Sequence, residues 1–206
     1  FGLGWYWFYA RKRVKREYSL LHVIERLTGE DSTGYLVDEE LREILINRDE
    51  IEQNHFKELI KNCEILELNK LLHPDEFAKL ISKKLSKKID IDDEKLYEIL
   101  KNKENDSNVV IHPGVAIFSH TIPDKDKFEI LLVRTKKGLI LSDDIDPVYA
   151  FFVILASPDQ RSFYLHTLMW IAEIAEKIDF NNDWINADDV DDLRALILDS
   201  WKKREF

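Results

Sequence analysis

The chain has 206 residues, of which 45% are hydrophobic and 34% charged, and this composition excludes both a disordered chain and a wholly membrane-embedded protein. Its net charge of −10 disfavours general nucleic-acid binding, because phosphate contacts need a basic face. The single cysteine, Cys63, excludes an internal disulfide framework and fits a reducing compartment.

The first sixteen residues differ from the rest of the chain. Residues 1–10 are apolar and aromatic, and five of the six residues from Arg11 to Arg16 are basic. Aromatic residues gather at the membrane interface, and basic residues gather on the cytoplasmic side of a span. Ten residues cannot cross a bilayer, since about 20 are needed. The pattern therefore predicts that residues 1–10 end a truncated transmembrane helix; an amphipathic helix packed on the domain is the alternative.

Residues 11–63 are predicted to form a helical juxtamembrane connector. The segment is not enriched in Gly, Ser or Pro, as a flexible linker would be. One amphipathic helix is expected over residues 18–27, with Gly29 as its C-terminal cap. A second is expected over residues 38–45, where Leu41, Ile44 and Leu45 share one face.

Strands and helices alternate from residue 64 onward. Residues 64–68 fit a short strand, and Pro74 with two acidic residues after it fits the start of a helix. A second helix begins at Asp92 or Asp93. The residues expected on the inward faces of these two helices are Phe77, Leu80, Ile81 and Leu85, then Leu96, Ile99 and Leu100.

The second half of the chain predicts the centre of a sheet. Residues 109–111 lead into a turn at 112–114, strands follow at 115–118 and 128–134, and residues 148–156 are apolar on both faces, as in a central strand. A long helix follows Pro158, Trp184 lies in a loop or short helix, and a last helix opens within the acidic residues 188–192. This order predicts an α/β fold with a mixed β-sheet flanked by helices on both faces.

Three segments carry a family resemblance. They are GVAIFSHT at 114–121, LASP at 155–158 and YLHTLMWIA at 164–172. Together they resemble the type-2 (fructose/mannitol) enzyme IIA domains of the bacterial sugar phosphotransferase system, which read G-[IV]-A-I-P-H and H-L-x-x-L-x-x-[IL]-A at the first and last segments. The resemblance implies an enzyme IIA-like domain over residues 64–206.

The sequence departs from this family at both histidines. In the family the first histidine accepts the phosphoryl group and the second steadies it; here Ser119 and Tyr164 occupy these positions, and His120 and His166 follow one and two residues later. A one-residue slip along a strand turns His120 to the opposite face unless a bulge intervenes. A two-residue slip turns His166 roughly 200° around its helix. His112 either belongs to the turn or lines the old site.

The displaced histidines predict a domain that is not phosphorylated and is not an enzyme. A serine needs a base to activate it, and its phosphate ester is too stable for a relay. No cofactor or metal is expected, because His22, His55 and His73 lack paired-ligand spacing. The acidic run from Asp143 to Asp146 lacks the spacing of a calcium loop.

The N-terminal stretch resembles the last span of amino acid/polyamine/organocation superfamily permeases, some of which carry enzyme IIA-like tails. The combination predicts a cytoplasmic regulatory or protein-interaction domain of a membrane amino acid transporter. Its partners would be the transmembrane permease core and a second copy of the tail, with no nucleic acid, and the basic run from Arg11 to Arg16 would lie near the membrane surface. Two alternatives stay open: an active enzyme IIA domain with phosphohistidine on His120, helped by His112 or His166, and a small-molecule sensor with a pocket near Ser119 and Tyr164.

Overall fold

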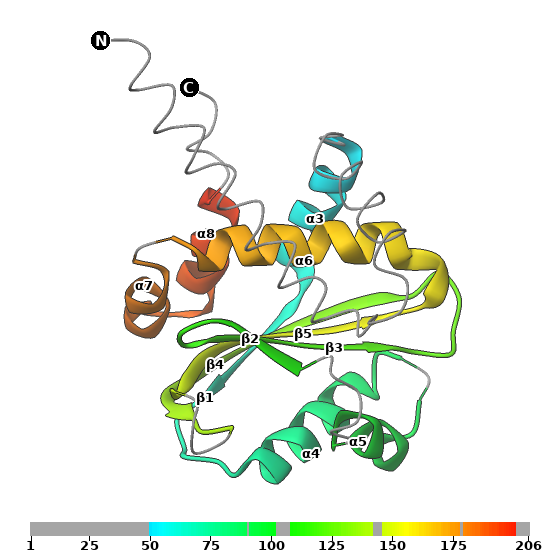
Figure 1. Cartoon of the computed structure of the whole chain (residues 1–206), viewed down its shortest axis with the longest axis horizontal. Helices are drawn as coiled ribbons and strands as arrows, with labels where there is room; N and C mark the ends of the chain where they lie inside the picture. Colours follow the sequence, from blue (N-terminus) through cyan, green and yellow to red (C-terminus); the bar gives the residue numbers. More distant parts are fainter. Residues whose placement is uncertain (1–49, 90, 102–107, 142–145, 178, 201–206) are drawn as a thin grey trace, which may run out of the picture.

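The computed structural model describes residues 50–89, 91–101, 108–141, 146–177 and 179–200. Within these ranges, five strands form one mixed sheet in the order β1-β4-β5-β3-β2, with helices on both faces (Figure 1). The predicted α/β fold is confirmed for this part of the chain. The helices predicted over 18–27 and 38–45, and the proposed end of a membrane span, lie outside the described residues.

The sheet is built around β5 (Val148–Ala156), which is buried along nearly its whole length. β5 pairs parallel with β3 (Val115–Thr121) and antiparallel with β4 (Phe128–Leu139). The edges are β1 (Glu64–Leu68), parallel to β4, and β2 (Asn108–His112), antiparallel to β3. The prediction of a central strand over 148–156 is therefore confirmed, whereas β3 and β4 run further than the sequence indicated.

One face of the sheet is covered by α4 (Pro74–Leu85) and α5 (Asp93–Lys101). α4 begins where the sequence predicts, with the backbone N–H of His73 donating to Glu76 Oε2 at 3.2 Å. The expected inward residues of the two helices are buried except Leu80 and Ile99, which lie at the margin and are only partly covered. The core on this face also includes Phe118, Val133, Phe151 and Leu155 from the strands.

The other face carries α3 (Glu50–Asn62), α6 (Arg161–Ala175), α7 (Phe180–Asn186) and α8 (Val190–Asp199), with a 3-10 turn (Pro158–Gln160) before α6 (Figure 1). α8 opens in the acidic run as predicted, because the Asp189 carboxylate accepts the backbone N–H groups of Asp191 and Asp192 at 2.9 Å. Trp184, which the sequence left in a loop or short helix, lies in α7 and is fully buried.

A buried cation fixes α7 and the loop before α8 to the sheet. Arg134 of β4 is 0% exposed, and its Nη1 donates to the carbonyl oxygens of Trp184 and Ala187. Its Nη2 forms an ion pair with Glu67 of β1. This one side chain therefore joins an edge strand, an inner strand and the α7–α8 loop.

Cys63 follows α3 and is buried beside Arg194 of α8, whose Nη1 donates to the Ile60 and Cys63 carbonyl oxygens. Burial raises the pKa of the Cys63 thiol to about 11, so the thiolate is scarce at neutral pH. Cys63 therefore packs as a small buried side chain rather than serving as a nucleophile. Across the described ranges, no helix is both long and apolar enough to span a bilayer.

Candidate functional site

The two positions that the family resemblance assigns to histidines meet in space. Ser119 lies near the end of β3 on the same sheet face as Ile117, and Tyr164 lies one turn into α6. Their hydroxyl oxygens, Ser119 Oγ and Tyr164 Oη, are 2.7 Å apart. The structure thus places a neutral hydroxyl–hydroxyl hydrogen bond where the motif pattern of the family places two imidazoles.

The environment of this pair keeps it uncharged. Ser119 is 2% exposed and Tyr164 is partly buried. Burial raises the pKa of the Tyr164 phenol above its ordinary value, and the Ser119 hydrogen bond and the Arg161 charge oppose that shift only in part. Neither side chain can act as a nucleophile at neutral pH without a base to remove its proton.

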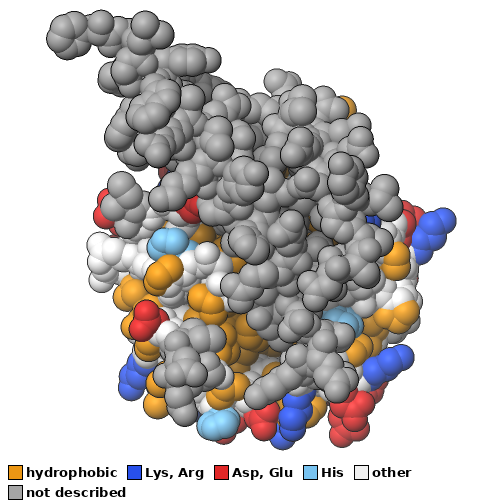
Figure 2. Space-filling view, viewed as in Figure 1, with side chains coloured by type: hydrophobic (Ala, Val, Ile, Leu, Met, Phe, Trp, Pro, Cys, Tyr) orange, Lys and Arg blue, Asp and Glu red, His pale blue; other side chains and the backbone are white. Residues whose placement is uncertain are grey.

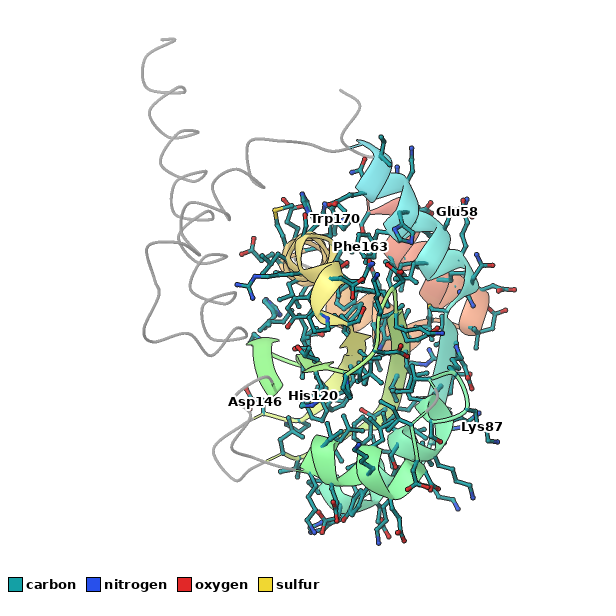
Figure 3. All side chains as sticks on the ribbon, turned by 90° about the vertical axis from the view of Figure 1, so that its right-hand side faces the viewer. Glu58, Lys87, His120, Asp146, Phe163 and Trp170 are labelled. Atoms are coloured by element: carbon teal, nitrogen blue, oxygen red, sulfur yellow. The ribbon has the colours of Figure 1, made fainter. Side chains whose placement is uncertain are left out.

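His120 faces the opposite side of the sheet from Ser119. Pairing of β3 with β5 is continuous from Val115 to Thr121, so no bulge in that ladder turns His120 back. By strand alternation His120 shares its face with Phe118, whose side chain packs in the α4–α5 core. Figure 3 shows His120 apart from Phe163, which lies in the layer of α3 and α6. His120 is half-buried, and this burial lowers its pKa.

His166 lies on α6, but on the side of the helix that contacts α3. Its Nδ1 donates to the Ser162 carbonyl oxygen at 3.0 Å, and Glu52 Oε2 of α3 lies 2.5 Å from the same nitrogen. Because the sheet separates the faces on which His120 and His166 lie, the two rings do not share one cleft. His112 ends β2, where its Nδ1 donates to the Pro113 carbonyl oxygen at 3.2 Å, as a turn residue would.

The turn between β3 and β4 is tied to the start of α6. Ser157 Oγ accepts from the Lys127 backbone N–H at 3.0 Å, and Asp159 Oδ2 accepts from the Asp126 backbone N–H at 2.9 Å. Desolvation opposes ionisation of Asp159, but hydrogen bonds from Ser157 and Asp126 outweigh it and lower its pKa to about 2. These hydrogen bonds place the β3–β4 turn beside the start of α6. We call the exposed residues Thr121, Pro123, Lys125 and Arg161, which lie at the end of β3, in the turn after it and at the start of α6, the site face.

No group of three or more metal-ligating side chains occurs within the part of the chain that the structure describes. Asp143 and Asp144 of the acidic run lie outside that part. Sequence reasoning identified positions 119 and 164 but missed Arg161 and Asp159. The one signal that could have found these two was their place at the start of the predicted long helix, directly after the break at Pro158.

The protonation of Tyr164 gives a testable pH dependence. Replacing Tyr164 with phenylalanine should cost about 1 kcal/mol at pH 8, the usual net value of one hydrogen bond. The folded wild-type protein binds the phenol proton more tightly than the unfolded chain, so wild-type stability should fall as pH rises past 10. The difference between the two proteins should therefore shrink between pH 8 and 10.5, as measured by urea denaturation. A constant difference across this range would contradict the burial of the phenol.

A five-stranded mixed sheet of this order, with its two motif positions on β3 and at the start of α6, defines an enzyme IIA-type domain. The family model described as "Phosphoenolpyruvate-dependent sugar phosphotransferase system, EIIA 2" matches residues 59–200, and the chain belongs to this family. Among solved structures, the nitrogen regulatory protein IIA-Ntr from Neisseria meningitidis is similar, with a TM-score of 0.60 and 15% identity over 69% of this chain and 98% of that one. At this identity the likeness shows the fold. A comparison with curated protein sequences finds no match.

Proposed function

We propose that this chain is a cytoplasmic regulatory domain of a membrane amino acid transporter, and that its enzyme IIA scaffold binds a protein partner rather than carrying a phosphoryl group. The observation that carries the proposal is the 2.7 Å hydrogen bond between Ser119 and Tyr164. It occupies both positions at which the family motifs have histidine. A phosphorelay needs a nucleophile that is free to attack and a phosphoryl bond that transfers onward, and a buried serine bonded to a neutral tyrosine supplies neither.

The position of the remaining histidines supports the loss of phosphoryl transfer. An active alternative would need His120 and a second imidazole to converge on one phosphoryl group. His120 and His166 instead belong to opposite faces of the sheet, and His112 is engaged with the Pro113 carbonyl group. The geometry therefore favours a binding role over the phosphotransfer alternative.

The surface chemistry supports a protein partner. Figure 2 shows acidic and basic side chains at the left, lower and right edges of the described surface, with hydrophobic side chains exposed between them. Exposed apolar side chains bordered by charged ones are common in protein interfaces. The net charge of −10 also disfavours a nucleic-acid partner, because it repels phosphate groups.

The transporter context comes from the sequence of residues 1–16. Under the proposal, residues 1–10 end a span, the basic run from Arg11 to Arg16 lies near the cytoplasmic membrane surface, and the domain contacts the permease core. A second copy of the tail is the other partner to test. Reading the gene upstream of Phe1 tests this context: the proposal expects a series of apolar segments of about 20 residues, and a start codon directly before Phe1 would contradict it.

The phosphorylation half of the proposal has a direct test. The purified domain, incubated with phosphoenolpyruvate and the general phosphotransferase proteins, should gain no acid-labile phosphohistidine by mass spectrometry. A stable phosphate on His120 would overturn this half of the proposal.

The binding half is tested through the site face. Reversing the charge of exposed Arg161, which sits beside Tyr164, should weaken binding to the transporter core at least about tenfold by surface plasmon resonance. Lys95 is the matched control, since it is an exposed cation on α5, beyond the other face of the sheet. Equal effects of Arg161→Glu and Lys95→Glu would place the partner elsewhere.

A further inference from the structure

Helix α3 packs against α6, the helix that carries Tyr164. Residues 50–58 of this helix precede the family match, which starts at residue 59. α3 contacts α6 and α8 on the outer side of the sheet. It is the first described element of the chain, and it touches the helix that carries Tyr164.

The C-terminal half of α3 is anchored firmly. Phe56 and Ile60 are 1% and 0% exposed and belong to the core. Arg194 of α8 donates to the Ile60 and Cys63 carbonyl oxygens at the end of the helix, where a cation also complements the helix dipole. This half of α3 moves only if the core itself opens.

The N-terminal half of α3 makes two side-chain contacts with the first turns of α6. The carboxylate of Glu52 lies with Oε2 at 2.5 Å from His166 Nδ1 and with Oε1 at 3.4 Å from Ser162 Oγ. The His55 ring stacks on Phe163 at a centroid distance of 4.3 Å. One carboxylate and one ring stack therefore join this half of α3 to α6.

The first turns of α6 connect this contact to the site. Ser162 and His166 are four residues apart and share the face that meets Glu52, whereas Tyr164 lies between them in sequence and roughly 200° around the helix from either. Tyr164 meets Ser119 on the sheet side at 2.7 Å. Because a packed helix moves as a rigid rod, a roll or slide of these turns changes both contacts together.

We propose that α3 controls the site face, so that pulling or releasing the segment before Glu50 shifts α6 through the Glu52–His166 contact and alters the Ser119–Tyr164 pair. Docked α3 holds Tyr164 on Ser119, and released α3 frees the first turns of α6 and with them Arg161. The inference rests on the proposed function in one respect, namely that the site face binds the partner. In this way a change in the N-terminal segment would alter the site face through α3 and α6.

The test measures the coupling in both directions on the 206-residue chain, without any partner. Glu52→Gln removes the charge but keeps the volume, and it should speed amide hydrogen exchange over residues 51–56 at least about fivefold. It should also shift the carbon-13 NMR signal of the Tyr164 ring carbon that bears the hydroxyl, assigned by its loss in Tyr164→Phe. Because coupling between sites is reciprocal, Tyr164→Phe should in turn speed exchange over residues 51–56.

Two further variants make the result decisive. Glu58 lies on the same helix, is 61% exposed and pairs only locally with Lys61 among the contacts described, so Glu58→Gln should change neither signal (Figure 3). Ser162→Ala removes the weaker contact with Glu52 and should act in the same direction as Glu52→Gln, with a smaller effect. The proposal is overturned if Glu52→Gln leaves exchange in α3 unchanged, or if it frees α3 without moving the Tyr164 signal. Neither result depends on the Arg161→Glu binding assay, so failure of the coupling and failure of the proposed function are distinguishable.

Discussion

Replacing Arg134 with methionine is expected to lower the free energy of unfolding by about 3–5 kcal/mol. The guanidinium is 0% exposed and pairs with Glu67, while its Nη1 donates to two backbone carbonyl groups around α7. Methionine fills similar space, so the cost comes from leaving the Glu67 carboxylate and the carbonyl oxygens of Trp184 and Ala187 without their donor. Urea denaturation of the purified domain measures the loss.

Lys136 is the matched control for this experiment. Its Nζ lies 4.0 Å from the same Glu67 carboxylate, but its side chain is 42% exposed. Exposed ion pairs contribute little, so Lys136→Met should change stability by no more than about 1 kcal/mol. Similar losses in the two variants would mean that Glu67 is not held by Arg134 in particular, and a loss below about 1 kcal/mol for Arg134→Met would contradict the burial of this charge.

The elements of the fold that depend on local pattern could be predicted from the sequence. Residues 148–156 are apolar on both faces, which only a strand covered from both sides tolerates, and β5 is the central strand. The starts of α4 and α8 follow from Pro74 and from the acidic run that contains Asp189. Hydrophobic periodicity and the residues that cap helices act over only a few positions, so they can be recognised in a single sequence.

Half of the candidate site could be predicted in the same way. The period of two along a strand places Ser119 and His120 on opposite faces, and the unbroken pairing of β3 with β5 keeps them there. The hydrogen bond between Ser119 and Tyr164 joins residues 45 apart in the chain, and its geometry depends on how α6 packs on the sheet. The periodicity of the sequence gives no information about the distance between these two side chains.

The contacts that the sequence could not indicate all join elements that are distant in the chain. Arg134 lies in the middle of β4, where a single sequence predicts an arginine that reaches solvent, but Glu67 and the carbonyl oxygens of Trp184 and Ala187 bind it in the interior. Glu52 and His166 lie more than a hundred residues apart, and neither forms part of a motif. Charged side chains are buried only when tertiary structure supplies a partner, so the partner must be known before the burial can be predicted.

Trp184→Ala is the second variant with a large expected effect, a loss of about 3–5 kcal/mol. Trp184 is 0% exposed, stacks on Phe152 and Phe180, and donates its Nε1–H to the Tyr149 carbonyl oxygen at 3.2 Å. Alanine leaves a cavity between α7 and the sheet and an acceptor without a donor. Trp184→Phe retains much of the ring and should cost about half as much in urea denaturation. Equal costs would assign the effect to the hydrogen bond rather than to the cavity.

The Arg134 and Trp184 side chains should also act together, because both fix α7 to the sheet. The Arg134 guanidinium binds the backbone of α7 at Trp184, and the Trp184 indole fixes the position of that same backbone. In Trp184→Ala, α7 is already loosened and its hydrogen bonds with the guanidinium are weakened. The free energy of unfolding lost in the double variant should therefore be smaller than the sum of the two single losses by about 0.5–3 kcal/mol. Strict additivity in the double-mutant cycle would mean that the two side chains hold α7 independently, and that α7 does not depend on the buried arginine for its position.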